Sequence, residues 1–380
     1  MYMKIKNILV ITLSGVLMLG FAGCGSQKGN ERTGSVKLNQ NNPTDVAESF
    51  VLSLVNKNFE VSAKLLGASD ETSYFTAGDV EWYVPRSEFA SVEKFYNIKT
   101  EITSEESNNS GSTANVSISI KEKEKEDNKE TLKVSLKRDN DNKWFVNSPD
   151  FYISDWHFVT PGGDTKVYID GKELPSSVES KAYGSTGLRK EYTISRIGKA
   201  EKEITVTAEN SFGEQKFKVN PTSNSSDEPY DCRVKLTDDK AYQSICDIWN
   251  NCYKDICDGK QASDLLKYVS PKADSNLTSQ IYDGIKTKAL GNGARGSDSF
   301  VCSNVRACSG EDYTSQWLTD KIASVHFNYD MSWTYKLVNW HKEMQNTTNV
   351  QLYLEDGNYT IHNPGEKFFT WYNNFTHETN

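Results

Sequence analysis

The sequence contains little histidine and lacks the common catalytic signatures. Five histidines occur in 380 residues, and His341, His362 and His377 stand at no spacing that would let them share a metal ion. No serine-nucleophile or zinc-protease motif is present. The glycine-rich stretch 291–296 follows an expected helix rather than a strand, so it is not placed as a nucleotide-binding loop. These absences predict no catalytic residue, no metal and no cofactor, and therefore a non-enzymatic protein.

A block of basic residues is also missing. The formal net charge is -9, and no basic run stands beside aromatic residues, which argues against nucleic acid as a partner. The one dense charge run, KEKEKEDNKE at 121–130, alternates in sign. Such alternation is typical of a solvated surface, so we expect this run at the tip of a hairpin.

An apolar run long enough to cross a membrane is absent, but a shorter one lies at the N-terminus. It extends from Ile8 to Phe21 behind the basic residues Lys4 and Lys6. A bilayer core of about 30 Å requires roughly 20 apolar residues, and this run falls short of that. Residues 1–23 are therefore predicted to be a signal peptide.

The end of this peptide, Phe21-Ala22-Gly23-Cys24, resembles the lipobox of bacterial lipoproteins. In that motif small residues precede a cysteine that is acylated and becomes the new N-terminus. The resemblance implies lipidation of Cys24, and two or more acyl chains anchor a protein stably where one does not. Residues 24–42 would be a flexible tether, which places the folded part at the extracytoplasmic face of the cell membrane. An ordinary secretory signal with an incidental cysteine is the alternative.

Cysteine is absent between Cys24 and Cys232, and six cysteines follow within one region. In an exported protein such a group is typical of up to three structural disulfides. Three of the six lie in an expected helix at 239–257, where Cys246 and Cys257 share a face but stand about 16 Å apart along the axis. They are therefore expected to bond partners outside the helix.

Two further cysteines beside an expected strand, Cys302 and Cys308, could bond each other across a tight loop. Metal binding and redox activity remain the alternatives to structural disulfides. The disulfide candidates are Cys232, Cys246, Cys252, Cys257, Cys302 and Cys308.

Hydrophobic periodicity divides the chain, whose length suits two or three domains. Segment 43–149 begins with helical patterns, one of them near 87–96, and continues with four strand patterns, so we expect an α+β domain. Segment 150–221 shows almost only strand patterns, with Asp170-Gly171 as a hairpin turn, and is expected to be a small β-sandwich module.

Residues 222–230 have the composition of a linker, and residues 231–380 repeat the order of helices followed by strands. The endings DNDNKWFVNSP and DGNYTIHNP resemble those of nuclear transport factor 2-like domains. The stretch VTPGGDTKVYIDGKEL, followed by YTISRIGKAEKEITVTA, resembles the β domain of the teicoplanin-resistance-associated surface proteins (TcaA type) of Gram-positive bacteria. Together these resemblances imply two cone-like domains, each of helices and a curved antiparallel sheet, flanking an all-β module. That family has a zinc ribbon and a membrane helix where this chain has its lipobox.

A pocket in the last segment is a further possibility. The expected strand ASVHFNYDMSWTYK places His326 and Asp330 on one face, and Trp333 and Tyr335 on the other. Cone-fold enzymes use His and Asp residues that project between sheet and helices, and aromatic residues line ligand clefts. These four residues and Tyr353 are the candidate pocket residues, although a polar strand face and core aromatics would explain them equally.

The leading prediction is a membrane-anchored lipoprotein of a Gram-positive bacterium that binds or scaffolds at the cell envelope. Its expected partners are the membrane, through the lipid, and a cell-wall component or another envelope protein. The alternative is a small-ligand receptor or an enzyme that uses the pocket of the last segment.

Overall fold

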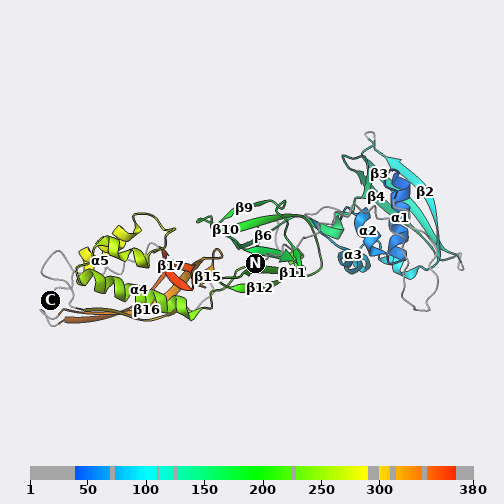
Figure 1. The fold of residues 1–380 in the computed structure, drawn as a ribbon. Coiled ribbons are helices and arrows are strands. Elements are labelled where there is room, and N and C mark those ends of the chain that lie inside the picture. The colour runs from blue at the N-terminus through cyan, green and yellow to red at the C-terminus, as the bar shows by residue number, and fades with distance from the viewer. Residues whose placement is uncertain are drawn as a thin grey trace, which may run out of the picture.

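The computed structural model describes residues 39–68, 73–108, 111–123, 127–223, 228–289, 299–308, 314–335 and 340–364. The predicted signal peptide, Cys24 and most of the predicted tether lie outside these ranges. The described chain is a mixed α+β structure in which strands predominate, and its elements form three groups in chain order (Figure 1). Each group has its own cluster of buried apolar side chains. No helix of the described part is long and apolar enough to span a bilayer.

The first unit, residues 39–151, begins with helices. Asn42 caps the first of them by accepting a hydrogen bond from the Thr44 backbone N–H at 2.9 Å, and Pro43 stands at the first helical position. A helix expected near 87–96 is instead a short 3₁₀ segment, η2 (Ala90–Lys94). The α-helices are α1 (Pro43–Val55), α2 (Phe59–Leu65) and α3 (Ala77–Tyr83), and η1 (Val84–Arg86) follows α3.

A four-stranded antiparallel sheet curls around α1 in this unit (Figure 1). Alternate residues of its central strands are buried against the helix, as the period of two predicts. The charge run 121–130 connects the central strands, which pair antiparallel with Lys121 opposite Lys129, in agreement with the hairpin prediction; residues 124–126 lie outside the described ranges. The strands lie in the order β2 (Ile98–Ser107), β3 (Thr113–Glu122), β4 (Lys129–Arg138) and β5 (Trp144–Val146).

The β module follows as two sheets that share one apolar core. Asp170 and Gly171 have positive φ values of 50° and 76°, which a two-residue hairpin turn requires, so this prediction is confirmed. The module's own strands are β6 (Tyr152–Pro161), β7 (Lys166–Ile169), β8 (Lys172–Glu173), β9 (Ser180–Tyr183), β10 (Arg189–Gly198), β11 (Lys202–Ala208) and β12 (Gly213–Val219), with short 3₁₀ segments η3 (Pro149–Phe151) and η4 (Pro221–Ser223) at either end.

Two short strands from outside the module complete one of its sheets. β1 (Ser73–Tyr74) pairs in parallel with β10, and β13 (Tyr230–Asp231) pairs in parallel with β6. The sheet order is therefore β1-β10-β6-β13, with β9 also on β10, while the second sheet has the order β12-β11-β7-β8. Hydrogen-bonded strands thus tie the module to the chain before and after it.

The last unit, residues 234–364, repeats the arrangement of the first. Helix α4 packs on a sheet of order β14-β16-β17-β18, with the short β15 beside β16. Sequential helices followed by a four-stranded meander therefore occur at both ends of the chain. The elements are α4 (Asp239–Cys257), η5 (Ala262–Tyr268), α5 (Leu277–Ala289), β14 (Ser299–Ala307), β15 (Gln316–Trp317), β16 (Ile322–Tyr335), β17 (Trp340–Glu355) and β18 (Asn358–Asn363).

Candidate functional site

The three candidate pocket residues whose side chains are described, His326, Asp330 and Tyr353, do not converge. On β16, Val325, Phe327 and Tyr329 are buried in the core beneath α4, so His326 and Asp330 point to the opposite face of the sheet. The hypothesis that these two residues project into a pocket between sheet and helices is therefore wrong. The alternation predicted for the strand is confirmed.

Both side chains have local surroundings of their own. Asp330 accepts a hydrogen bond from Asn304 Nδ2 at 2.6 Å and lies 3.6 Å from Arg306 on the neighbouring β14. Partial burial lowers the pKa of the His326 imidazole. The Ser315 hydroxyl accepts a hydrogen bond from His326 N at 2.9 Å and fixes the backbone there. These contacts tie the outer face of β16 to its neighbours.

Of the aromatic candidates, Tyr353 has a described side chain, and it lies away from His326. Tyr353 pairs across the sheet with Ile322 and joins a small apolar cluster that Leu188 of the β module contacts. His326 stands four residues from Ile322 along β16, about 13 Å at the rise of a strand. The side chains of Trp333 and Tyr335 lie outside the described part of the chain.

In the described part of the last unit, apolar side chains occupy the interior between helices and sheet. Trp249 and Ile256 of α4 belong to the same buried cluster as Phe327 and Leu352 of the sheet, and all four are at most 5% exposed. Within the described ranges, no three His, Cys, Asp or Glu side chains gather in a way that could hold a metal ion. The first unit has the same kind of filled interior.

All six cysteines after Cys24 carry free thiols in the structure. Cys302 and Cys308 stand six residues apart along and just beyond one strand, on the order of 15–20 Å, whereas a disulfide needs Cα atoms within about 7 Å. A bond between these two, which the sequence left open, is therefore excluded. Cys232 lies in the core of the β module, and Cys257 is exposed at the end of α4.

One pair is close, namely Cys246 of α4 and Cys302 of β14. The Cys246 Sγ–H donates to the Cys302 carbonyl at 3.0 Å, which brings the two residues together. Asn250 also donates to this carbonyl at 3.0 Å and accepts from the Cys302 N–H at 2.8 Å. Burial raises the pKa of both thiols, and that of Cys252 to about 12. Disulfides stay a prediction, and this is the pair that the geometry favours.

A buried ion pair joins the first unit to the β module. Asp79 of α3 and Lys202 of β11 are 1% and 4% exposed, and Lys202 Nζ lies 2.8 Å from Asp79 Oδ2. The backbone N–H and the hydroxyl of Thr76 both donate to the same oxygen at 2.9 Å. The backbone of Gly198 packs directly on the carboxylate, and a Cβ at this position would stand only 1.9 Å from Asp79 Oδ1. Asp170 adds a partly exposed partner for the lysine at 3.2 Å.

The contact between the first unit and the β module that contains this ion pair is called a seam below. Two clefts flank it. One, of about 540 Å³, has two acidic and two basic side chains in its lining, Glu60, Lys64, Asp170 and Lys172. The other, of about 500 Å³, has three basic side chains and one acidic side chain, Lys137, Arg138, Arg196 and Asp139. The charges balance in the first cleft and leave a positive excess in the second.

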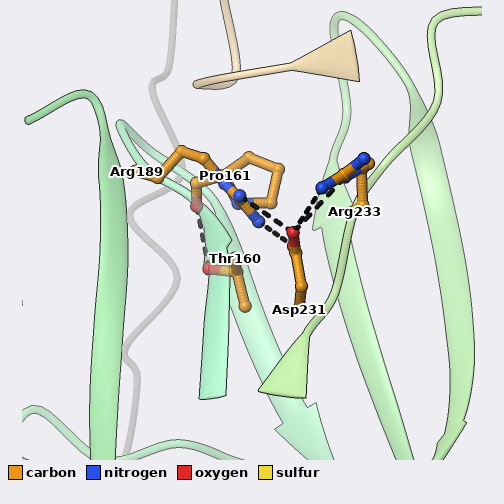
Figure 2. A network of polar contacts seen from close by, with 5 residues as sticks. All are labelled: Thr160, Pro161, Arg189, Asp231 and Arg233. Atoms are coloured by element: carbon orange, nitrogen blue, oxygen red, sulfur yellow. Dashed lines mark hydrogen bonds and ion pairs between the residues drawn. The ribbon is translucent and has the colours of Figure 1, made fainter. Parts of the chain in front are cut away.

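A second polar network holds β13, which leads from the module toward the last unit, against β10. Figure 2 shows the guanidinium groups of Arg189 and Arg233 meeting at the carboxylate of Asp231, where β13 leaves the module. Arg189 is 8% exposed. The Thr160 hydroxyl donates to the Pro161 carbonyl at 2.9 Å behind this network. Sequence reasoning missed both seams, because their members are far apart in the chain.

Comparison with known proteins places the chain in no family. No protein-family model matches it, and no curated protein matches its sequence. A solved structure named "Ntf2 like protein involved in plasmid conjugation" is similar at 9% identity, over 77% of this chain and 89% of that chain. The TM-score of that comparison is 0.21.

Proposed function

We propose that this chain is a lipid-anchored, extracytoplasmic protein that acts at the cell envelope by binding or scaffolding and not by catalysis. The observation that carries the proposal is the apolar interior in the described part of the last unit, where a receptor or enzyme of cone-like fold would have an open cavity with polar groups pointing into it. His326 and Asp330 point away from that interior. The alternative of a pocket-based receptor or enzyme is therefore less favoured.

The proposal includes a finer assignment of the three parts. The first and last units are taken as nuclear transport factor 2-like domains, and the β module as a TcaA-type domain. Support comes from the shared order of helices followed by a four-stranded meander in both units. The buried pair Asp79–Lys202 and the Arg189–Asp231 contact stiffen the seams, as a spacer between the membrane and a partner requires.

Membrane attachment is assigned to Cys24 on the strength of the lipobox resemblance. Cell fractionation of a Cys24→Ala variant tests this step, with Cys257→Ala as a matched control because that cysteine is exposed on α4. Wild type and control should be processed and sediment with membranes, and Cys24→Ala should remain unprocessed. Normal processing and anchoring of Cys24→Ala would show that the lipoprotein assignment is wrong.

The binding role is tested by capture from envelope extracts that include peptidoglycan fragments. The full-length protein in detergent is the bait, and a heat-unfolded sample of it is the control. A partner that is retained by the native bait alone supports the proposal. Turnover of any envelope component by the purified protein would favour the enzyme alternative instead.

A further inference from the structure

The cleft with the positive excess contains one arginine that is held in place before any ligand arrives. Arg196 of β10 donates from Nη1 to the carbonyls of Leu66 and Gly67 at 3.0 and 2.9 Å. Its guanidinium carbon also lies 4.9 Å from the ring centre of Tyr152. Gly67 permits this approach, because a Cβ at that position would stand 2.2 Å from Nη1. The side chain is thus fixed by two carbonyls and a ring.

This fixed guanidinium still has donors to offer. Arginine carries five N–H groups, and the contacts to Leu66 and Gly67 engage Nη1 alone. A fork of parallel N–H groups matches carboxylate and phosphate oxygens, which is why arginine is favoured for such anions. Because the side chain is already ordered, a ligand would not have to supply the free energy of ordering it.

The rest of the lining adds positive charge at the rim. Lys137 and Arg138, at the end of β4, are exposed side chains that line the same cleft as Arg196. The single carboxylate, that of Asp139, already accepts a hydrogen bond from the Lys143 N–H at 2.8 Å. In a chain of net charge -9, this cleft is a local reversal of sign.

We propose that the cleft formed by Lys137, Arg138 and Arg196 binds an anionic group, a phosphate or a carboxylate, of an envelope component. This inference rests on the proposed binding function and names the chemistry of the ligand. Arg196 would make the directed contact, and the two rim residues would raise the local concentration of anions. Lys64, in the neighbouring cleft of balanced charge, has no such role.

The test is calorimetric titration of the full-length protein in detergent at low ionic strength. The probes are inorganic phosphate, citrate and the deacylated headgroup of phosphatidylglycerol, which separate a free anion, a carboxylate and a lipid source. Arg196→Gln should weaken binding of the preferred probe about tenfold or more, since hydrogen bonds to charged groups are the strong ones. The Lys137→Gln/Arg138→Gln double variant should weaken it less and reduce its salt dependence.

Lys64→Gln is the matched control and should bind as wild type does. The Lys137→Gln/Arg138→Gln variant separates a loss of binding from misfolding. Both side chains are exposed, so replacing them should reduce affinity without disturbing the packing around Arg196. Absence of binding by the wild-type protein at millimolar probe would overturn the inference, as would equal affinities of wild type and the two cleft variants. Either result leaves the Cys24 fractionation test untouched, so failure of the cleft and failure of the anchor are distinguishable.

Discussion

Replacing Lys202 with methionine should lower the free energy of unfolding by about 3–5 kcal/mol, because removal of one partner strands a buried charge. The Asp79 carboxylate is 1% exposed, so water cannot take the place of the ammonium group. Its Oδ2 would keep only the two donors of Thr76, and its Oδ1 already has no hydrogen-bond partner in the described structure. The lost charge-assisted bond accounts for about 1.5–3 kcal/mol, and the under-solvated carboxylate for the remainder.

Urea unfolding followed by tryptophan fluorescence is a suitable assay, since Trp156 lies in the core of the β module. At about 2 kcal/mol per molar urea, the midpoint of the module should fall by roughly 1.5–2.5 M. The Asp79→Asn/Lys202→Met double variant should recover most of this loss, because the amide keeps an acceptor for Thr76 and no charge remains buried.

Lys216→Met provides the control. Lys216 lies on β12 in an ion pair of 3.1 Å with Glu203, but its side chain is 53% exposed, so the midpoint should not move measurably. The reasoning would be refuted if Lys202→Met unfolded at the wild-type midpoint. It would equally fail if the double variant were less stable than Lys202→Met alone.

Three further predictions follow from the same structure. Gly198→Ala should destabilise the seam because its Cβ would overlap the buried carboxylate, whereas Gly78→Ala, with no contact closer than 3.7 Å, should be neutral or slightly stabilising in urea unfolding. Peptide mapping of the alkylated, non-reduced protein from membranes should find Cys246 joined to Cys302, and recovery of both as free thiols would contradict the pairing. Burial lowers the pKa of His326 below 6.5, so the unfolded state takes up its proton first and stability present above pH 6.5 should be lost as the pH falls. A histidine titration by NMR that gives His326 a pKa at or above 6.5 would refute this.

Local signals in the sequence were sufficient for most elements. The cap at Asn42 and Pro43 predicts the start of α1, and the alternation in β3 and β4 predicts both the strands and their buried faces. The turn at Asp170-Gly171 is equally local, because only a few residues have low-energy conformations at positive φ. The mixed α+β class follows from these elements.

Long-range pairings could not be predicted in the same way. A two-residue strand such as β1 has no periodicity, and its partner in β10 is remote in the chain. The pair Asp79–Lys202 and the fixed Arg196 depend on this docking, since neither has a motif around it. The expected pocket failed for a related reason, because alternation defines two faces of β16 but not which of them the helices cover.

The strands β1 and β13, which join the module's sheet from outside it, have a consequence for the order in which the chain folds. Synthesis and export both proceed from the N-terminus, so Ser73 reaches the compartment where the chain folds before its partner Arg196 in β10 does. Until then β1 has no sheet to join, and the β6 edge stays open until Tyr230 is available. An open edge is a template for pairing with other chains. Fragments that end near residue 221 should therefore aggregate, and a fragment meant to contain the folded module should extend from before residue 73 to beyond residue 231.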